Sequence, residues 1–140
     1  MTEVDFLEGI LTVAALRHHR KFTVNDTRFD QAMAAAYRRL IGDPALSEHL
    51  DIEFNIRPHP IHGDSPVVRG AINAAVGDRR ARRVNPTFKM MEATTLIVEP
   101  DASEQFLRRL PGGAAVYEKL AETFLDAYYR SETEARTAVP

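Results

Sequence analysis

Apolar residues recur every three or four positions along four long stretches of the chain, the spacing that places them on one face of an α-helix. These stretches are residues 3–19, 28–41, 67–76 and 114–130. Two shorter stretches, residues 44–50 and 101–110, begin with residue types that favour a helix start. The pattern therefore predicts five or six helices.

The residues at the ends of these stretches support the helix predictions. Thr2 and Ser65 stand where an N-cap side chain accepts a hydrogen bond from the first turn, and Pro66 follows where its missing N–H costs nothing. Gly42 and Gly77 stand where a left-handed glycine would end the second and fourth helices. The first helix is predicted to bury one face and to expose the other. The exposed face would carry Asp5, Glu8, Gly9 and Thr12.

Other stretches have the pattern of β-strands. Residues 51–57 (DIEFNIR) alternate apolar and polar side chains, which is typical of a half-buried strand. Residues 94–99 (TTLIVE) are rich in β-branched side chains, and residues 22–24 form a shorter β-prone stretch. After Gly77, the basic sequence DRRARRV, the turn-forming residues 85–87 and FKMME favour a short hairpin.

Together these elements predict an α+β fold that is mainly helical, with five or six helices around a small β-sheet in which residues 51–57 and 94–99 take part. The length of 140 residues is typical of one domain, and no linker or repeat divides the chain. We expect a globular domain over residues 1–130. The polar residues 131–140 have little apolar surface to bury, so we expect a mobile tail there.

The composition excludes several classes of protein. The chain has no cysteine, which excludes a disulfide-built secreted domain and any thiolate metal site. The first residues are acidic where a signal or transit peptide would be basic, and no apolar run is long enough to span a bilayer. We therefore expect a soluble, cytoplasmic protein without a membrane partner.

Charge is distributed unevenly along the chain. The formal net charge is −2, yet residues 65–89 contain six basic residues and one acidic residue, a local charge of +5. Residues 90–140 carry a local charge of −4. An anionic partner would therefore meet the middle of the chain and not its end.

The predicted elements of this basic region are a helix, a glycine stop, four arginines within five residues and a basic hairpin. This order resembles that of winged-helix proteins, which present a recognition helix and a wing to DNA. The resemblance is an analogy of element order, and it implies a non-enzymatic regulator that binds duplex nucleic acid. A run of arginines that is merely solvated at a helix C-terminus is the alternative interpretation.

The residues of this predicted interface would divide into two roles. Arg69 and Asn73, four residues apart on the helix, would read base edges, and the arginines of the hairpin would contact phosphates. The predicted nucleic-acid-binding residues are Arg69, Asn73, Arg79, Arg80, Arg82, Arg83 and Lys89.

Histidines offer a second interpretation, a small metal-dependent enzyme. His59, His62 and Asp64 lie in one loop (PHPIHGD) and are residue types that bind zinc or another divalent ion. His18 and His19 would have to complete the shell, but on the first helix His18 falls on the apolar side and His19 on the polar side. We therefore assign no metal ligand and no cofactor.

Carboxylates for acid–base catalysis are the other enzymatic possibility. Glu53 lies beside Asp51 and Asn55 on the polar side of the predicted strand 51–57. An exposed strand face ordinarily has this composition, and the sequence lacks the GxSxG, P-loop, GxGxxG and HExxH motifs. We assign no catalytic residue, and an enzyme is the least favoured interpretation.

Protein recognition, including self-association, is the first alternative to nucleic-acid binding and ranks above an enzyme. Tyr128 and Tyr129 are adjacent near the end of the last predicted helix, so they cannot both face one core. One of them would be free to contact a protein partner or a second copy of the chain.

Overall fold

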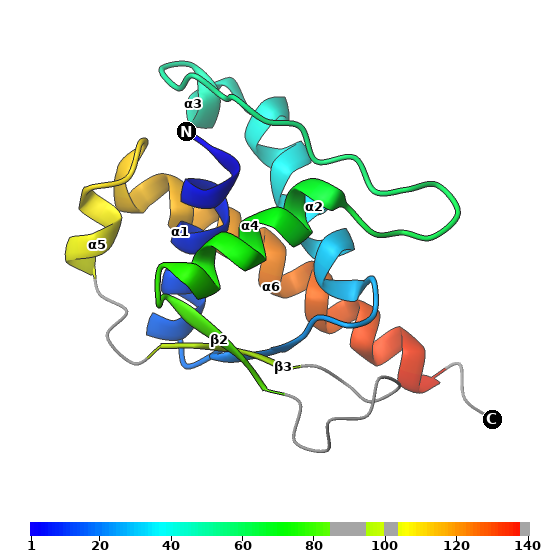
Figure 1. Cartoon of the computed structure of the whole chain (residues 1–140). Coiled ribbons are helices and arrows are strands. Elements are labelled where there is room, and N and C mark those ends of the chain that lie inside the picture. The colour runs from blue at the N-terminus through cyan, green and yellow to red at the C-terminus, as the bar shows by residue number, and fades with distance from the viewer. Residues whose placement is uncertain (85–94, 100–103, 138–140) are drawn as a thin grey trace.

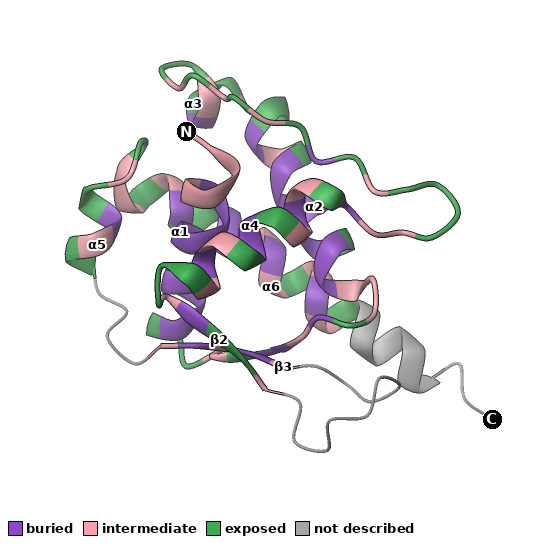
Figure 2. Ribbon diagram, in the orientation of Figure 1, coloured by how far each residue is buried: buried purple, intermediate pink, exposed green. Residues whose placement is uncertain are grey.

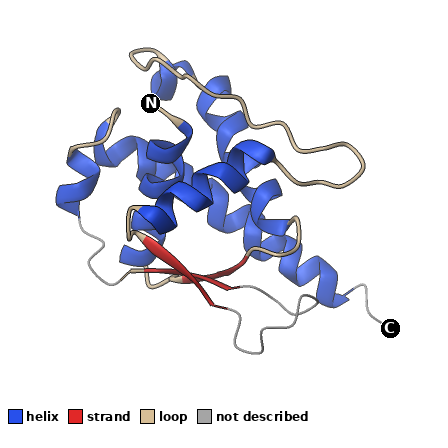
Figure 3. Cartoon of the chain, viewed as in Figure 1, coloured by secondary structure: helices blue, strands red, loops and turns tan. Residues whose placement is uncertain are grey.

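The part of the chain that the structure describes folds into six helices and a three-stranded sheet (Figures 1 and 3). The computed structural model describes residues 1–84, 95–99 and 104–137, with side chains as far as Arg130. The predicted mainly helical α+β class is confirmed. In chain order the elements are α1 (Glu3–Leu16), β1 (Lys21–Thr23), α2 (Arg28–Gly42), α3 (Pro44–Ser47), α4 (Pro66–Gly77), β2 (Ala81–Val84), β3 (Thr95–Val98), α5 (Glu104–Arg108) and α6 (Gly113–Thr137).

Helix α1 lies inside the molecule, packed against α4 and α6 (Figures 1 and 2). The predicted exposed face is wrong for Glu8, Gly9 and Thr12, which are all buried because neighbouring elements cover the helix on several sides. Gly9 lies against the ring of Tyr117 in α6. A Cβ atom at Gly9 would lie 2.3 Å from Cδ1 of that ring, so the close approach of the two helices requires glycine.

Helices α2 and α6 pack against each other, and aromatic rings fill the space between them and β1. The Phe124 ring lies 5.3 Å from Phe22 and 5.4 Å from Phe29, measured between centroids. Leu120 and Phe124 are fully buried, which confirms that the last helix belongs to the core. This helix continues to Thr137, beyond the end expected near residue 130, and residues 138–140 of the expected tail lie outside the described residues.

The sheet has the strand order β1-β3-β2, with both pairs antiparallel. The central strand β3 confirms the strand predicted at residues 94–99, and its buried side chains Leu96 and Val98 belong to the hydrophobic core. Strand β2 is the basic strand of the expected hairpin, but its partner is β3. The expected turn 85–87 and second strand 88–92 lie outside the described residues.

Residues 51–57 do not form the predicted strand. Their alternation is real, since the three apolar side chains are partly or fully buried and the polar ones are exposed. However, this segment hydrogen-bonds to the start of the chain: the Met1 amino group donates to the Asp51 carbonyl (2.7 Å), and Glu53 N–H donates to the Met1 carbonyl (3.2 Å). A period of two residues indicates a half-buried extended chain, but it does not say whether another strand pairs with it.

The helix starts predicted from the N-caps Thr2 and Ser65 are confirmed. Thr2 and Asp5 form a complete capping box at the start of α1. The Ser65 hydroxyl accepts a hydrogen bond from Val68 N–H at the start of α4, and Pro66 occupies the first turn. Satisfied amide groups at these ends explain why both helices begin where the sequence places them.

The predicted helix ends are wrong in detail. Gly42 and Gly77 are the last helical residues of α2 and α4 and are not left-handed stops. The left-handed residues that follow α1 and α4 are His18 (φ 70°) and Arg79 (φ 61°). Sequence reasoning assigned this role to the glycines because glycine adopts positive φ without a steric cost.

Within the described residues, no helix has the length and apolar composition that crossing a membrane requires.

Candidate nucleic-acid interface

Helix α4 leaves one face open to solvent. Val68, Ala71, Ile72 and Ala75 are buried on the inner face of α4. The residues exposed on the outer face are Pro66, Gly70, Asn73 and Gly77. Of the two residues predicted to read bases, only Asn73 therefore lies on this outer face.

Arg69 is held by other parts of the protein, with 32% of its side chain exposed, so its guanidinium does not lie free on the outer face as a base-reading role would need. Its guanidinium pairs with the fully buried Asp30 carboxylate at 2.9 Å and also donates to the carbonyl oxygens of Val24 and Asp26. Asp30 in turn accepts a hydrogen bond from Ser65 N–H (2.7 Å), so this cluster joins the start of α4 to α2.

Typical interaction free energies favour the pairing of Arg69 with Asp30 over a contact between Arg69 and a base. Removing one partner of a fully buried ion pair costs about 3–5 kcal/mol, and the cost is lower where the cation is partly exposed, as Arg69 is at 32%. A good bidentate contact between a side chain and a base is worth about 1–3 kcal/mol. Turning the Arg69 guanidinium outward to contact a base would therefore lose more free energy than the base contact provides, so the side chain stays with Asp30.

Arg79 lies at the C-terminal end of α4 with its side chain exposed. Two hydrogen bonds form a Schellman motif there: Arg80 N–H donates to the Ala75 carbonyl (3.0 Å), and Arg79 N–H donates to the Val76 carbonyl (3.1 Å). The motif requires a left-handed residue, and Arg79 supplies it at φ 61°. The Schellman motif thus fixes the backbone conformation at Arg79, whose side chain projects into solvent.

Arg80 packs against a neighbouring helix. Its guanidinium carbon lies 3.8 Å from the centroid of the Phe106 ring in α5, a cation–π contact. The side chain is half-buried, so Arg80 contributes to the structure as well as to the local charge.

A pair of carboxyl groups lies beside these arginines. Glu8 is buried in α1, and its carboxyl hydrogen-bonds to the Asp78 side chain at the end of α4. The pKa of Glu8 is raised from 4.5 to about 8, chiefly by burial and also by the hydrogen bond and the charge of Asp78, while the charge of Arg80 lowers it. The raised pKa favours the protonated form of Glu8 at neutral pH, in which the carboxyl can donate to Asp78, while Oε1 of Glu8 is buried without a hydrogen-bond partner among the described residues.

The two arginines of β2 point to opposite sides of the sheet. Arg82 pairs with Ile97, and its Nε lies 3.5 Å from a Glu99 carboxylate oxygen. Arg83 pairs with Leu96, which is buried under the helices, so Arg83 projects from the helix-covered side at the edge of the sheet. Arg83 is exposed.

The structure therefore separates the seven predicted residues. Arg69 is paired with Asp30, Arg80 and Arg82 also have protein partners, and Lys89 lies outside the described residues. Three exposed side chains remain along the continuous segment from α4 to β2 (Figure 1). We call these three residues, Asn73, Arg79 and Arg83, the α4–β2 surface.

The histidines do not converge. His59 and His62 stack at 4.7 Å between ring centroids in the loop after residue 57, and His59 Nδ1 accepts the N–H groups of Ile61 and His62. His18 is exposed and not packed as predicted, because α1 ends before it, and His19 Nδ1 lies 3.1 Å from the Tyr129 hydroxyl. Among the described residues, no three His, Asp or Glu side chains are grouped so that they could hold a metal ion.

The residues considered for catalysis and for protein contact have ordinary structural surroundings. Asp51, Glu53 and Asn55 are exposed on the segment that runs past Met1. Tyr128 is buried and its hydroxyl accepts Thr23 N–H (2.8 Å), while Tyr129 packs against His19. The side chain of Tyr129, which was expected to be free to contact a partner, thus contacts His19 of the same chain.

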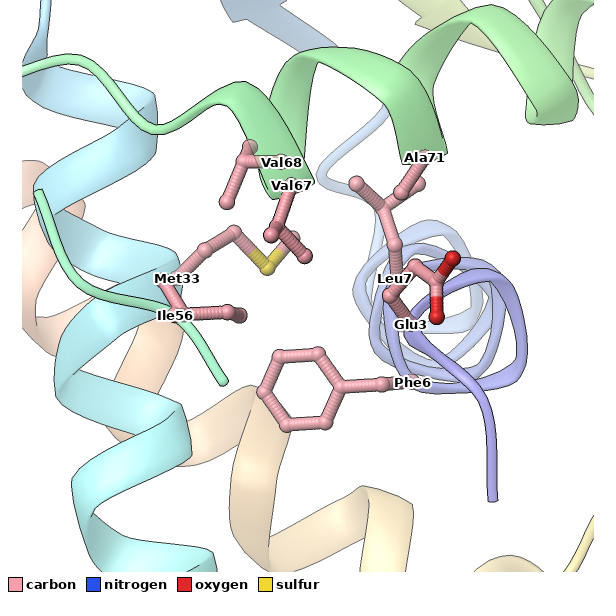
Figure 4. Close-up of a pocket in the computed structure, with 8 residues that line it drawn as sticks. All are labelled: Glu3, Phe6, Leu7, Met33, Ile56, Val67, Val68 and Ala71. Atoms are coloured by element: carbon pink, nitrogen blue, oxygen red, sulfur yellow. The ribbon is translucent and has the colours of Figure 1, made fainter. Parts of the chain in front are cut away.

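The gap in the core between α1, α2 and α4 is lined almost entirely by apolar side chains (Figure 4). Its lining residues are Glu3, Phe6, Leu7, Met33, Ile56, Val67, Val68 and Ala71. The gap has no volume that a water molecule could occupy. It is a feature of core packing and provides no ligand site.

An open cleft of about 270 Å³ lies beside β1, at the opposite edge of the sheet from β2. Its lining includes the cations Lys21 and Arg28, and Arg28 pairs with Asp26 at 3.2 Å. The cleft is separate from the α4–β2 surface.

Comparison with known proteins gives no relative: no protein-family model, no curated protein and no solved structure matches this chain.

Sequence reasoning missed two residues that shape this region, Glu8 and Phe106. Helical spacing assigned Glu8 to an exposed face, and nothing in the sequence around Phe106 indicates its contact with Arg80. The contacts of both residues come from segments distant in sequence, and no local signal identifies them.

Proposed function

We propose that this chain is a non-enzymatic protein that binds duplex nucleic acid, chiefly through the backbone phosphates, with the α4–β2 surface toward the duplex. The observation that carries the proposal is the pair Arg79 and Arg83. Both side chains are exposed, and neither forms an ion pair with any of the residues that the structure describes. They lie in the segment whose local charge is +5.

The order of elements supports the proposal by analogy. A helix (α4) leads directly into an antiparallel pair of strands (β2 and β3), and β1 joins the far edge of β3. Winged-helix domains that bind DNA share this order, with the helix before the strand pair in the major groove and the connection between the strands as the wing. The likeness is one of topology only, so the charges carry more weight than the analogy does.

Phosphate binding by these arginines has a measurable signature. Each phosphate that is neutralised releases condensed counterions, so the affinity falls as salt rises, and each arginine contributes about one unit to the slope of log K against log salt. Base contacts contribute little to this slope.

The test is fluorescence anisotropy of a labelled random-sequence DNA duplex, titrated with the purified protein at about 50 mM salt and at higher salt concentrations. We expect a complex at micromolar protein and a steep loss of affinity with salt. The double variant Arg79→Ala, Arg83→Ala should bind at least about tenfold more weakly and lower the salt slope by about two units.

Two control variants make this test specific. Arg38→Ala combined with Arg130→Ala also removes two exposed arginines, but from α2 and α6, and Arg130 pairs with Asp126. Arg82→Ala removes a cation from β2 that already pairs with Glu99. Both should bind nearly as well as the parent. The proposal is wrong if no complex forms at micromolar protein and about 50 mM salt, or if the α2/α6 control loses as much affinity as the Arg79/Arg83 variant.

A further inference from the structure

The outer face of α4 offers few groups that could distinguish one base pair from another. Reading a base edge in the major groove requires side chains that donate or accept hydrogen bonds, or an apolar group set against a thymine methyl. The exposed residues of this face are Pro66, Gly70, Asn73 and Gly77. Only Asn73 among them has a side chain that hydrogen-bonds, and only Pro66, at the first turn, has an apolar side chain that could meet a thymine methyl.

Arg69 does not add a second reader. Its guanidinium is held by Asp30 and by the carbonyl oxygens of Val24 and Asp26, and Asp30 is fully buried. Withdrawing Arg69 from this cluster would leave the Asp30 charge buried without a partner.

Packing does not require glycine at Gly70 or Gly77 on the outer face. No heavy atom lies within 4 Å of the position that a Cβ atom would take at Gly70 or at Gly77. Larger side chains would fit at both positions, and a helix generally prefers them to glycine. The helix therefore presents a smooth surface where a sequence-reading helix would present side chains.

We propose that the α4–β2 surface holds duplex DNA of any sequence and that α4 reads no bases. This inference rests on the proposed nucleic-acid binding and specifies its partner class. The cations at the C-terminal end of α4 and on β2 contact phosphates, which are the same for every sequence. Asn73 alone does not provide the several base contacts on which sequence recognition depends.

The test is a competition among short unlabelled duplexes of different sequence, including A·T-only, G·C-only and mixed duplexes, against one labelled duplex. We expect affinities that agree within about threefold, and no enriched motif when the protein selects from a random pool. A motif bound more than about tenfold tighter than the pool overturns the inference while leaving the proposed function intact. Absence of binding to every duplex contradicts the proposed function itself.

A pair of variants tests the same point at the residue level. Asn73→Ala should leave the relative affinities of the competing duplexes unchanged, since Asn73 is exposed and the change should not disturb the fold. Arg83→Ala should weaken binding to all duplexes by a similar factor. If Asn73→Ala weakens binding to one duplex by more than about tenfold relative to the others, α4 reads sequence and the inference is wrong.

Discussion

At the residue scale, the two left-handed non-glycine residues stand in equivalent positions. His18 and Arg79 each follow a helix, and each supplies the positive φ of a Schellman motif: His19 N–H donates to the Ala14 carbonyl (2.8 Å) after α1, as Arg80 N–H donates to Ala75 after α4. A side chain with a Cβ atom is strained in this conformation, and glycine is not. Both residues adopt this conformation with their side chains exposed.

The first prediction uses these two sites as a matched pair. Arg79→Gly and His18→Gly should each raise the free energy of unfolding by about 0.5–1 kcal/mol, because each removes the strain of a left-handed residue. Only Arg79→Gly should weaken DNA binding, since only Arg79 belongs to the α4–β2 surface. Urea denaturation and anisotropy measure the two effects. Equal binding by both variants would show that the Arg79 side chain is dispensable.

At the element scale, α6 connects the aromatic cluster to the rest of the core. Phe124 is fully buried, with rings from β1 and α2 on either side of it. The helix reaches α1 through Tyr117, whose ring rests on Gly9. The two rings together join α6 to three other elements, and loss of Phe124 alone removes the contacts with β1 and α2.

The second prediction concerns this helix. Phe124→Ala should lower the free energy of unfolding by about 3–5 kcal/mol, because it removes a fully buried ring and leaves a cavity. Glu122→Ala, two positions away and exposed, should change it by less than about 0.5 kcal/mol. Urea denaturation of both variants is the measurement. A loss below about 1 kcal/mol for Phe124→Ala would contradict the placement of α6 in the core.

At the scale of the whole molecule, buried carboxyl groups link stability to pH. The pKa of Glu8 rises from 4.5 to about 8, chiefly because of burial, and burial also raises the pKa of Asp30 against the opposing effect of Arg69. A carboxyl with a raised pKa keeps its proton in the folded state after the unfolded chain has lost it. For Glu8, the free energy of unfolding therefore falls as pH rises from about 4.5 to about 8, and this loss is complete above that range.

The third prediction follows from that linkage. At pH 9 the free energy of unfolding of Glu8→Gln should exceed that of the parent by roughly 1–3 kcal/mol, because glutamine cannot ionise and still donates to Asp78. The variant should therefore also unfold at a higher temperature. At pH 4.5 the two proteins should differ little. Thermal denaturation followed by circular dichroism between pH 4.5 and 9 measures this difference. A parent protein that becomes more stable across this range, with no effect of Glu8→Gln, would contradict the assignment.

Features that depend on near neighbours in the chain follow from the sequence alone. The helical spacing located α1, α2, α4 and α6, and the caps at Thr2 and Ser65 located two helix starts, because the hydrogen bonds of a helix join residues three or four positions apart. The β-branched stretch located β3. The local charge of +5 in residues 65–89 is likewise a property of consecutive residues.

The tertiary structure decided which of these residues are free to act. Residues 51–57 have the pattern of a strand, but the chain start pairs with them and the sheet takes β1 instead. Arg69 has the position of a base-reading residue, but Asp30, 39 residues away in sequence, binds it. Glu8 has a polar side chain on a helix that other elements surround. Strand pairing, burial and ion pairing depend on distant segments that meet only in the folded chain, and periodicity along the sequence does not determine them.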